Sequence, residues 1–483
     1  MRKTQRIAII VTALVWTAVI VGWHLSTPSK HLQPSLPGAD MRPEGTLRKA
    51  DDVVVGEFFM RYSSEAPSNN LHSQWNGFRG PQRSAVITGT TPITLLPDSF
   101  RHVWTISTGE GHAAPAVWNG RVYILDYDEK LSSDALRCIS LADGTELWRR
   151  WYRLPMKRNH GFSRTIPAIG SDGIIASIGP EGHVMCCDAT SGDMLWSLDM
   201  KKRFESEIPF WYSGQCPLVD NNQLILAPAG KDTLIAAFDL HTGHILWATP
   251  NTPGFRMSHS SVMPITLGSK PMYVYAAIGG VCGISADVSD RGKLLWQSTE
   301  WKPSVIAPSP ILIAPDKLFF GAGYGAGGAQ LQVTRNSGTW TAKVIEQYKA
   351  EQGLSTEQQT PIFYNNKIIT ILPKNGGPMR ERICIYSPTD LHKPMWTSSS
   401  DERFGLGPYI IIDDKLFVLK ETGELYVYKI DNNSPTLLHH QTVIHDAADA
   451  WGPMAYADGY LIVRDATHIT CLQITEIPPQ KTL

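Results

Sequence analysis

The sequence predicts an all-β fold, an eight-bladed β-propeller of four-stranded blades, preceded by a single N-terminal transmembrane helix. Three observations support this prediction. Strands and turns without helices repeat about every 45 to 52 residues. A proline leads into an apolar strand in each of eight copies, and an uncharged apolar run lies near the amino terminus.

Residues 1–25 are predicted to form a cytoplasmic basic tip and a transmembrane anchor. Arg2, Lys3 and Arg6 precede the uncharged run 7–23, which is long enough for a helix to cross a bilayer. Basic residues on the leading side favour a cytoplasmic amino terminus, so we expect a single pass through the inner membrane and a propeller in the periplasm or extracytoplasmic space. A cleaved signal peptide is the alternative, although no small-residue cleavage pattern follows the run.

A Pro/Ser-rich spacer, residues 26–74, follows the anchor, because its prolines interrupt regular elements. Within it, residues 53–60 are apolar enough to form a short strand or a segment that docks on the globular body, and the sequence leaves both open. Residues 75–99 form a lead-in segment, and residues 478–483 form a tail.

Residues 100–477 contain the repeat. After each proline come an apolar strand, a tight turn such as NG, NN or DD, and a second strand; Asn, Asp and Gly tolerate the left-handed dihedrals of such turns. A third and a fourth strand complete the copy. Strands alone at this period favour a propeller over a β-helix or a helical solenoid. The markers are Pro115, Pro167, Pro217, Pro264, Pro310, Pro361, Pro408 and Pro453.

The fourth strand ends in tryptophan in five copies, which gives each sheet an apolar plug against its neighbour. The fifth copy has Trp340 away from the usual position, and the seventh has lost the tryptophan. The last copy is one strand short, and we expect residues 100–108 to complete it, because pairing the first strand with the last sheet removes two exposed edges. The five residues are Trp148, Trp196, Trp247, Trp296 and Trp396.

The composition excludes several classes of function. The chain has 44 basic and 45 acidic side chains, so no broad electrostatic field favours a nucleic-acid partner. Its seven cysteines lack the spacings of zinc or c-type haem sites, and no metal is predicted. Hydrolase, metalloprotease and nucleotide-binding motifs are absent from the sequence, and the glycine-rich run 321–330 is expected to be a loop between two blade strands.

The strand, turn and Leu-Trp pattern resembles the PQQ-like (quinoprotein alcohol dehydrogenase-like) β-propeller repeat family over residues 100–474. The segment WNGFRGPQRSAV, residues 75–86, resembles the lead-in of bacterial membrane or periplasmic propellers. This family implies two functions, because it contains quinone-dependent dehydrogenases that use Ca²⁺ as well as non-catalytic, BamB-like binders. The resemblance therefore implies the fold without deciding the function.

For the enzyme branch, the resemblance implies a vicinal disulfide over the quinone, a Trp floor, a neighbouring Arg, Ca²⁺ bound by carboxylate and amide oxygens, and an Asp base. Cys186 and Cys187 are adjacent, but Cys187 occupies the strand position of Cys138 and Cys384. Adjacent strand residues point to opposite faces, so core packing is favoured over a disulfide. No cluster of acidic and amide residues matches the calcium site, and no catalytic residue is predicted.

A ligand site is predicted where the loops before the proline markers gather at one mouth of the central channel. Such a mouth suits a small polar ligand or a peptide end. The alternative is that these side chains satisfy strand-end backbone groups or hold ordered water. The candidate ligand-binding residues are His112, His160, Arg164, Trp211, Tyr212, Gln215, His259, Ser260, Gln358, Arg403 and Trp451.

The sequence thus predicts a monomeric, membrane-anchored propeller that acts as a non-catalytic scaffold for a protein partner or a small polar ligand, without a cofactor. One alternative is a dehydrogenase that oxidises alcohols or sugars with pyrroloquinoline quinone (PQQ) and calcium. A second alternative is a glycan-binding surface propeller.

Overall fold

The computed structural model describes residues 3–25, 53–63, 71–89, 100–430 and 434–475. The chain divides into two compact units, residues 1–52 and 53–483. In the first unit, α1 (Lys3–Leu25) is helical. Over the described residues, no helix meets the length and apolarity needed to cross a membrane, so the predicted transmembrane anchor at 7–23 is not supported. The location of the propeller stays a prediction. Most of the predicted spacer and the tail 478–483 lie outside the described residues.

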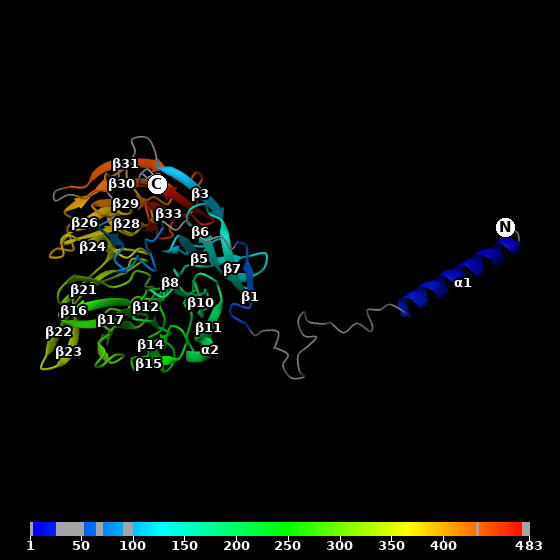
Figure 1. Cartoon of the computed structure of the whole chain (residues 1–483), viewed down its shortest axis with the longest axis horizontal. Coiled ribbons are helices and arrows are strands. Elements are labelled where there is room, and N and C mark those ends of the chain that lie inside the picture. The colour runs from blue at the N-terminus through cyan, green and yellow to red at the C-terminus, as the bar shows by residue number, and fades with distance from the viewer. Residues whose placement is uncertain (1–2, 26–52, 64–70, 90–99, 431–433, 476–483) are drawn as a thin grey trace, which may run out of the picture. The chain divides into compact units, whose positions relative to one another are not determined.

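The second unit contains eight antiparallel sheets of four blade strands each, which confirms the predicted all-β propeller (Figure 1). Blades 1 and 2 consist of β4 (Ala116–Trp118), β5 (Arg121–Asp128), β6 (Ser133–Ser140), β7 (Glu146–Arg153), β8 (Ala168–Ile169), β9 (Ile174–Ile178), β10 (His183–Asp188) and β11 (Met194–Asp199). Blades 3 and 4 consist of β12 (Leu218–Asp220), β13 (Gln223–Leu226), β14 (Thr233–Asp239), β15 (Ile245–Pro250), β16 (Met263–Leu267), β17 (Lys270–Ala277), β18 (Gly280–Ser285) and β19 (Leu294–Ser298).

The remaining blades follow along the chain, except that the fourth strand of blade 8, β3, precedes blade 1. Blades 5 and 6 consist of β20 (Ile311–Ala314), β21 (Lys317–Ala322), β22 (Gly327–Asn336), β23 (Thr339–Tyr348), β24 (Ile362–Tyr364), β25 (Lys367–Ile371), β26 (Ile383–Tyr386) and β27 (Trp396–Thr397). Blades 7 and 8 consist of β28 (Tyr409–Ile412), β29 (Lys415–Leu419), β30 (Glu424–Lys429), β31 (Thr436–Thr442), β32 (Ala455–Ala457), β33 (Tyr460–Arg464), β34 (His468–Gln473) and β3 (Arg101–Ser107). Short helices occur at α2 (Met200–Phe204), η2 (Ala350–Gln352) and η3 (Gly377–Met379).

The proline markers stand at the start of the innermost strands, as predicted. Pro115, Pro167, Pro361 and Pro408 each directly precede the first strand of a blade. Proline has no N–H to donate to a ladder, so it is tolerated at the first residue of an edge strand. The prolines therefore fix where each blade begins at the axis.

The tryptophan at the end of one blade packs against a turn of the next blade. Trp196 of blade 2 donates from Nε1 to the carbonyl of Leu240 in blade 3 at 2.9 Å. In the same turn, a Cβ built on Gly243 would lie 2.6 Å from the Trp196 ring, and its φ is +71°. Only glycine combines that backbone conformation with such a close approach, so this Gly-Trp contact sets the spacing between blades.

The ring closes as the sequence predicts. Strand β3 pairs antiparallel with β34, the last strand of the chain, with Trp104 opposite Cys471. Figure 1 shows β3 beside the red C-terminal strands. Blade 8 is thereby built from both ends of the repeat region, and no strand of this sheet is missing.

The segment 53–60 is docked on the propeller, and its last residues belong to an added strand. Strand β1 (Phe58–Arg61) pairs antiparallel with β7, the outermost strand of blade 1. The ring of Phe58 stacks on Trp151 at 5.6 Å, and the Arg150 guanidinium lies 4.6 Å from the Phe59 ring. The sequence left two possibilities open, a short strand or a segment that docks on the globular body. The structure shows both, because the end of the segment forms a strand and this strand pairs with blade 1.

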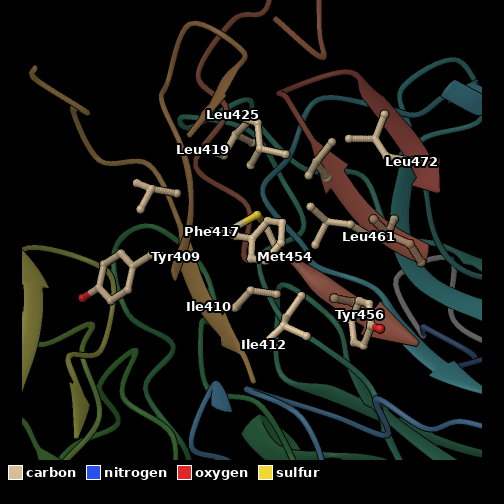
Figure 2. Packing of buried hydrophobic residues seen from close by; sticks show 14 of the residues in the cluster. Tyr409, Ile410, Ile412, Phe417, Leu419, Leu425, Met454, Tyr456, Leu461 and Leu472 are labelled. Atoms are coloured by element: carbon tan, nitrogen blue, oxygen red, sulfur yellow. The ribbon is translucent and has the colours of Figure 1, made fainter. Parts of the chain in front are cut away.

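The core lies within and between the blades. Figure 2 shows Phe417 and Leu419 of blade 7 lying opposite Tyr456 and Leu461 of blade 8 in one buried cluster. All seven cysteines are buried free thiols, which confirms the prediction of core packing. Residues 323–326 of the glycine-rich run form the turn between β21 and β22, so the predicted loop is confirmed for the middle of the run, whereas residues 321–322 and 327–330 lie in the two strands.

Candidate functional site

The lead-in segment enters the axis of the propeller. Trp75 exchanges two backbone hydrogen bonds with Val117 of β4, at 2.9 and 2.8 Å, and the Asn76 carbonyl accepts from Ile169 of β8. Strand β2 (Val86–Ile87) then pairs parallel with β28. Because β4, β8 and β28 are the innermost strands of three blades, residues 75–87 line the channel, and we call them the plug.

Two arginines fasten the plug to further blades. Arg79 donates from Nη2 to the carbonyls of Ser84 at 2.8 Å and Pro361 at 3.0 Å, and from Nη1 to that of Thr360. Arg83 donates from Nη1 to the carbonyl of Pro217 at 3.0 Å and lies over the Phe78 ring at 5.2 Å. Burial lowers the pKa of each guanidinium to about 10, which leaves both charged at neutral pH. The plug therefore joins blades 3 and 6 through cationic hydrogen bonds.

A cavity of about 330 Å³ lies above the plug, at the mouth formed by the loops before the innermost strands. Trp75, Phe78, Arg79 and Ala85 of the plug form one side of its lining. The loops bring seven of the eleven predicted residues to the same cavity, from blades that are far apart in sequence. These seven are His112, His160, Arg164, Trp211, His259, Gln358 and Trp451.

Four predicted residues do not line the cavity. Gln215 is buried and pairs with the backbone of Ala227 through both its Nε2 and its Oε1, at 2.9 Å each. Ser260 is fully buried. The hydroxyl of Tyr212 donates to the carbonyl of Lys157, and Arg403 donates to that of Arg380.

Gln215, Tyr212 and Arg403 bond to backbone groups, as the alternative in the sequence analysis proposed, whereas the buried Ser260 hydroxyl makes no hydrogen bond within the described residues. The sequence could place a residue in a loop before a proline marker. It could not show whether that side chain turns toward the axis or toward its own strand ends.

Two histidines of the cavity, His112 and His259, are held neutral by their surroundings. Burial, with the nearby cations Arg464 and Arg164, lowers the pKa of His112 to about 3. Burial and Arg164 lower the pKa of His259 to about 4. A neutral imidazole offers one donor and one acceptor, so these rings can bind a polar ligand without changing charge near pH 7.

The lining carries an excess of positive charge. Arg79, Arg164 and Lys374 are the cationic residues of the lining, and Glu357 is its only acidic residue among those the structure describes. Arg164 donates to the backbone carbonyls of Asn159 and His160 at 2.8 and 2.9 Å, and burial lowers its pKa to about 10. These bonds hold its guanidinium at the cavity without neutralising it.

Aromatic rings frame the cavity. Trp211 and Tyr324 stack with ring centroids 5.4 Å apart and planes 5° apart, although their loops belong to blades 3 and 5. On the lining nearer to blade 8, the His112 ring stacks on Trp451 at 5.0 Å. Both pairs contribute to the lining, and they offer flat apolar faces beside the cationic groups.

Several lining residues were not among the sequence candidates. The plug residues were not among the candidates because the lead-in lies outside the repeat. The repeat therefore gave no indication of where their side chains would lie. Tyr324 was absent because its glycine-rich loop lies between strands rather than before a proline marker. An arginine pair next to Trp75 and Phe78, ahead of the first repeat, is the signal that could have identified the plug.

Eight four-stranded blades around an axis, with a cavity at one mouth, define a β-propeller with an axial binding cavity. A family model described as outer membrane protein assembly factor BamB matches residues 132–358. No curated protein sequence matches the chain. The matched stretch is just under half of the chain, and together with the fold it makes the chain similar to the PQQ-like β-propellers.

Solved structures of both functional branches share this fold. BamB from Moraxella catarrhalis is 11% identical, with a TM-score of 0.51, covering 78% of this chain and 100% of its own. A europium-containing methanol dehydrogenase is 13% identical, with a TM-score of 0.55 and coverages of 81% and 89%. The quinohemoprotein alcohol dehydrogenase ADHIIG from Pseudomonas putida HK5 is 11% identical, with a TM-score of 0.54 and coverages of 85% and 82%. At these identities the likeness concerns the fold alone.

The residues of this chain do not fit the quinone and calcium site that the resemblance implies. Cys186 and Cys187 lie inside β10, and they belong to two different core clusters on opposite faces of the sheet. They are free thiols whose pKa burial raises. Hard cations need several converging oxygen ligands. Within the described ranges, no group of three or more His, Cys, Asp or Glu side chains is placed to hold a metal.

Proposed function

We propose that this chain is a non-catalytic binding propeller whose axial cavity captures a small ligand or the end of a partner polypeptide. The observation that carries this proposal is the convergence of loops from separate blades on one cavity above the plug. The lining combines flat aromatic faces with a few polar groups, the usual character of a ligand site. The match to a family described as an assembly factor supports a role in binding a partner.

A photo-crosslinking experiment tests this role in the full-length chain in its native cells. A photoreactive phenylalanine analogue replaces Tyr324, which lies at the cavity and is 60% exposed. The matched control carries the same analogue at Val288, which is 82% exposed and does not line the cavity. A discrete adduct from position 324, and none from position 288, is the expected result.

A variant with a filled cavity shows whether the crosslinked ligand binds inside the cavity. Ala307 lines the cavity, so Ala307→Trp should abolish the adduct while leaving the melting temperature close to that of the wild type. An adduct that persists in this variant would contradict binding inside the cavity.

The dehydrogenase alternative has a separate test. PQQ and Ca²⁺ are added to the purified chain, and dye reduction with simple alcohols and sugars is followed. Stoichiometric quinone binding with substrate-dependent dye reduction would replace the scaffold proposal by the enzyme. We expect neither, because Cys186 and Cys187 are buried on opposite faces of β10 rather than facing the cavity.

A further inference from the structure

The charge and shape of the cavity also indicate the chemical class of its ligand, on the basis of the binding role proposed above. We propose that the cavity binds a terminal carboxylate carried on an apolar or aromatic body. Two sources share this chemistry, a small organic acid and the last residue of a polypeptide.

The shape of the cavity favours the end of a molecule over the middle of a chain. The plug crosses the channel beneath the cavity and pairs with the innermost strands of blades 1 and 7. Its residues Trp75 and Ala85 line the cavity and are only 1% and 3% exposed. A polypeptide therefore cannot pass along the axis, whereas a chain end or a small acid can enter. A volume of about 330 Å³ is at the small end of the range for ligand sites, about 300–1,000 Å³.

The charge of the cavity selects the carboxylate over an amine. Arg79 and Arg164 make their hydrogen bonds to backbone carbonyls. No ion pair joins either of them, or Arg83 beneath, to a carboxylate in the part of the chain that the structure describes. Buried charges are costly unless they are paired. An anionic group in the cavity would supply the missing countercharge.

The remaining lining suits an apolar body. Beside the stacked Trp211 and Tyr324, the wall contains several aliphatic side chains that have no polar group to offer. They are Ile166, Val305, Ala307, Leu406 and Met454. A ligand with a flat or aliphatic body can bury it there while its carboxylate meets the cationic side.

Calorimetric titration of the full-length chain with matched probes tests the inference. The probes are N-acetylphenylalanine, its neutral primary amide, and the cationic phenylalanine amide, which differ in charge while keeping the same ring. The acid is expected to bind at least about tenfold more tightly than the neutral amide. An N-acetylated pentapeptide ending in phenylalanine, as free acid and as amide, separates the two sources. Tighter binding of the pentapeptide acid than of the single residue identifies a polypeptide end, and the reverse order identifies a small acid.

Variants that are expected to change the affinity in opposite directions show whether the charge of the lining causes the preference for the acid. Glu357→Gln removes the only acidic residue of the described lining and should tighten binding of the acid about threefold or more. Arg164→Gln should weaken it about tenfold. Arg403→Gln is the matched control, because Arg403 also lies in a mouth loop and donates to a backbone carbonyl but does not line the cavity. Lys374→Met changes an exposed residue of the lining and should also weaken binding of the acid. This variant leaves the loop of Arg164 unchanged, so a loss of binding cannot come from a rearrangement of that loop.

Equal or tighter binding of the neutral or cationic amide would overturn the carboxylate inference, and so would weaker acid binding by Glu357→Gln. Either result leaves the binding role standing, since a ligand still enters the cavity. The failure of the binding role is recognised separately, by a crosslink at position 324 that is missing or that Ala307→Trp does not remove.

Discussion

The indole Nε1–H of Trp104 donates to the carbonyl oxygen of Leu141 at 2.8 Å. Trp104 stands in the strand that completes blade 8, and Leu141 precedes the last turn of blade 1. In that turn, a Cβ built on Gly144 would lie 2.8 Å from the Trp104 ring. The same tryptophan–glycine packing occurs between blades 2 and 3. The contact that closes the ring between blades 8 and 1 is therefore of the kind that sets the spacing between other blades.

Removing this contact should destabilise the whole propeller. Trp104→Ala loses a buried indole and a hydrogen bond, and we expect the free energy of unfolding to fall by about 3–5 kcal/mol. Equilibrium unfolding in urea measures the change. Trp340→Ala is the control, because Trp340 lies half-buried on the outer strand of the degenerate fifth blade, and it should cost clearly less. Equal losses of unfolding free energy in the two variants would mean that the closing contact contributes no more to stability than Trp340 does.

The repeat register made most of the fold predictable. Proline starts, hairpin turns and terminal tryptophans are local features of each copy, so eight blades and the closing strand could be derived from the chain alone. Membrane crossing by residues 7–23 is the prediction that the structure does not support. The pairing of the plug with Val117 and Ile411 could not be derived, because it joins residues outside any repeat to strands of two different blades.

The cavity was predictable only in part for a similar reason. The position of their loops brings His112, Arg164 and Trp451 to the mouth. The repeat predicts this position, but it does not predict the direction in which a side chain points. Gln215 shares that position but pairs with Ala227 instead, which depends on rotamer and neighbouring backbone. Tyr324 reaches the cavity through a turn with φ of +57° at the tyrosine itself, a local conformation that no periodicity predicts.

The two plug arginines should respond differently to substitution. Arg79→Met leaves several carbonyls without their donor, and we expect a loss of about 1–3 kcal/mol and faster amide hydrogen exchange in residues 75–87. Arg83 has Nε and Nη2 buried without a hydrogen-bond partner, so Arg83→Met removes a poorly satisfied charge together with one hydrogen bond to Pro217 and should cost less stability than Arg79→Met. Exchange followed by mass spectrometry, with urea unfolding, compares the pair. A larger loss for Arg83→Met would contradict this view of the plug.

His112 and His259 of the cavity should stay uncharged over the physiological pH range. The pKa of His112 is lowered to about 3 and that of His259 to about 4, chiefly by burial. We therefore expect their ring resonances, assigned with His112→Gln and His259→Gln, not to titrate between pH 5.5 and 8. Affinity for a carboxylate probe should likewise not depend on these rings over that range. A titration midpoint near 6.5 for either ring would show that the cavity is open to water.

Asp134 should make stability depend on pH in the opposite direction to most carboxylates. It is buried between blades 1 and 2, where the Tyr152 hydroxyl donates to its Oδ2 at 2.7 Å. Burial raises its pKa from 3.8 to about 7, against the smaller effect of that hydrogen bond. The folded state therefore holds a proton that the unfolded state releases between about pH 4 and pH 7. Its contribution to stability is full below pH 4 and is lost as the pH rises through 7.

Asp134→Asn isolates this contribution, because the amide keeps the shape and an acceptor for Tyr152 but does not ionise. The difference in free energy of unfolding between the variant and the wild type should grow in favour of the variant as the pH rises from 4 to 8, by about 4 kcal/mol. Urea unfolding at several pH values measures it. Asp401→Asn at an exposed site serves as the control and should leave the profile unchanged. A difference that is constant with pH would show that Asp134 ionises in the folded protein as it does in the unfolded chain.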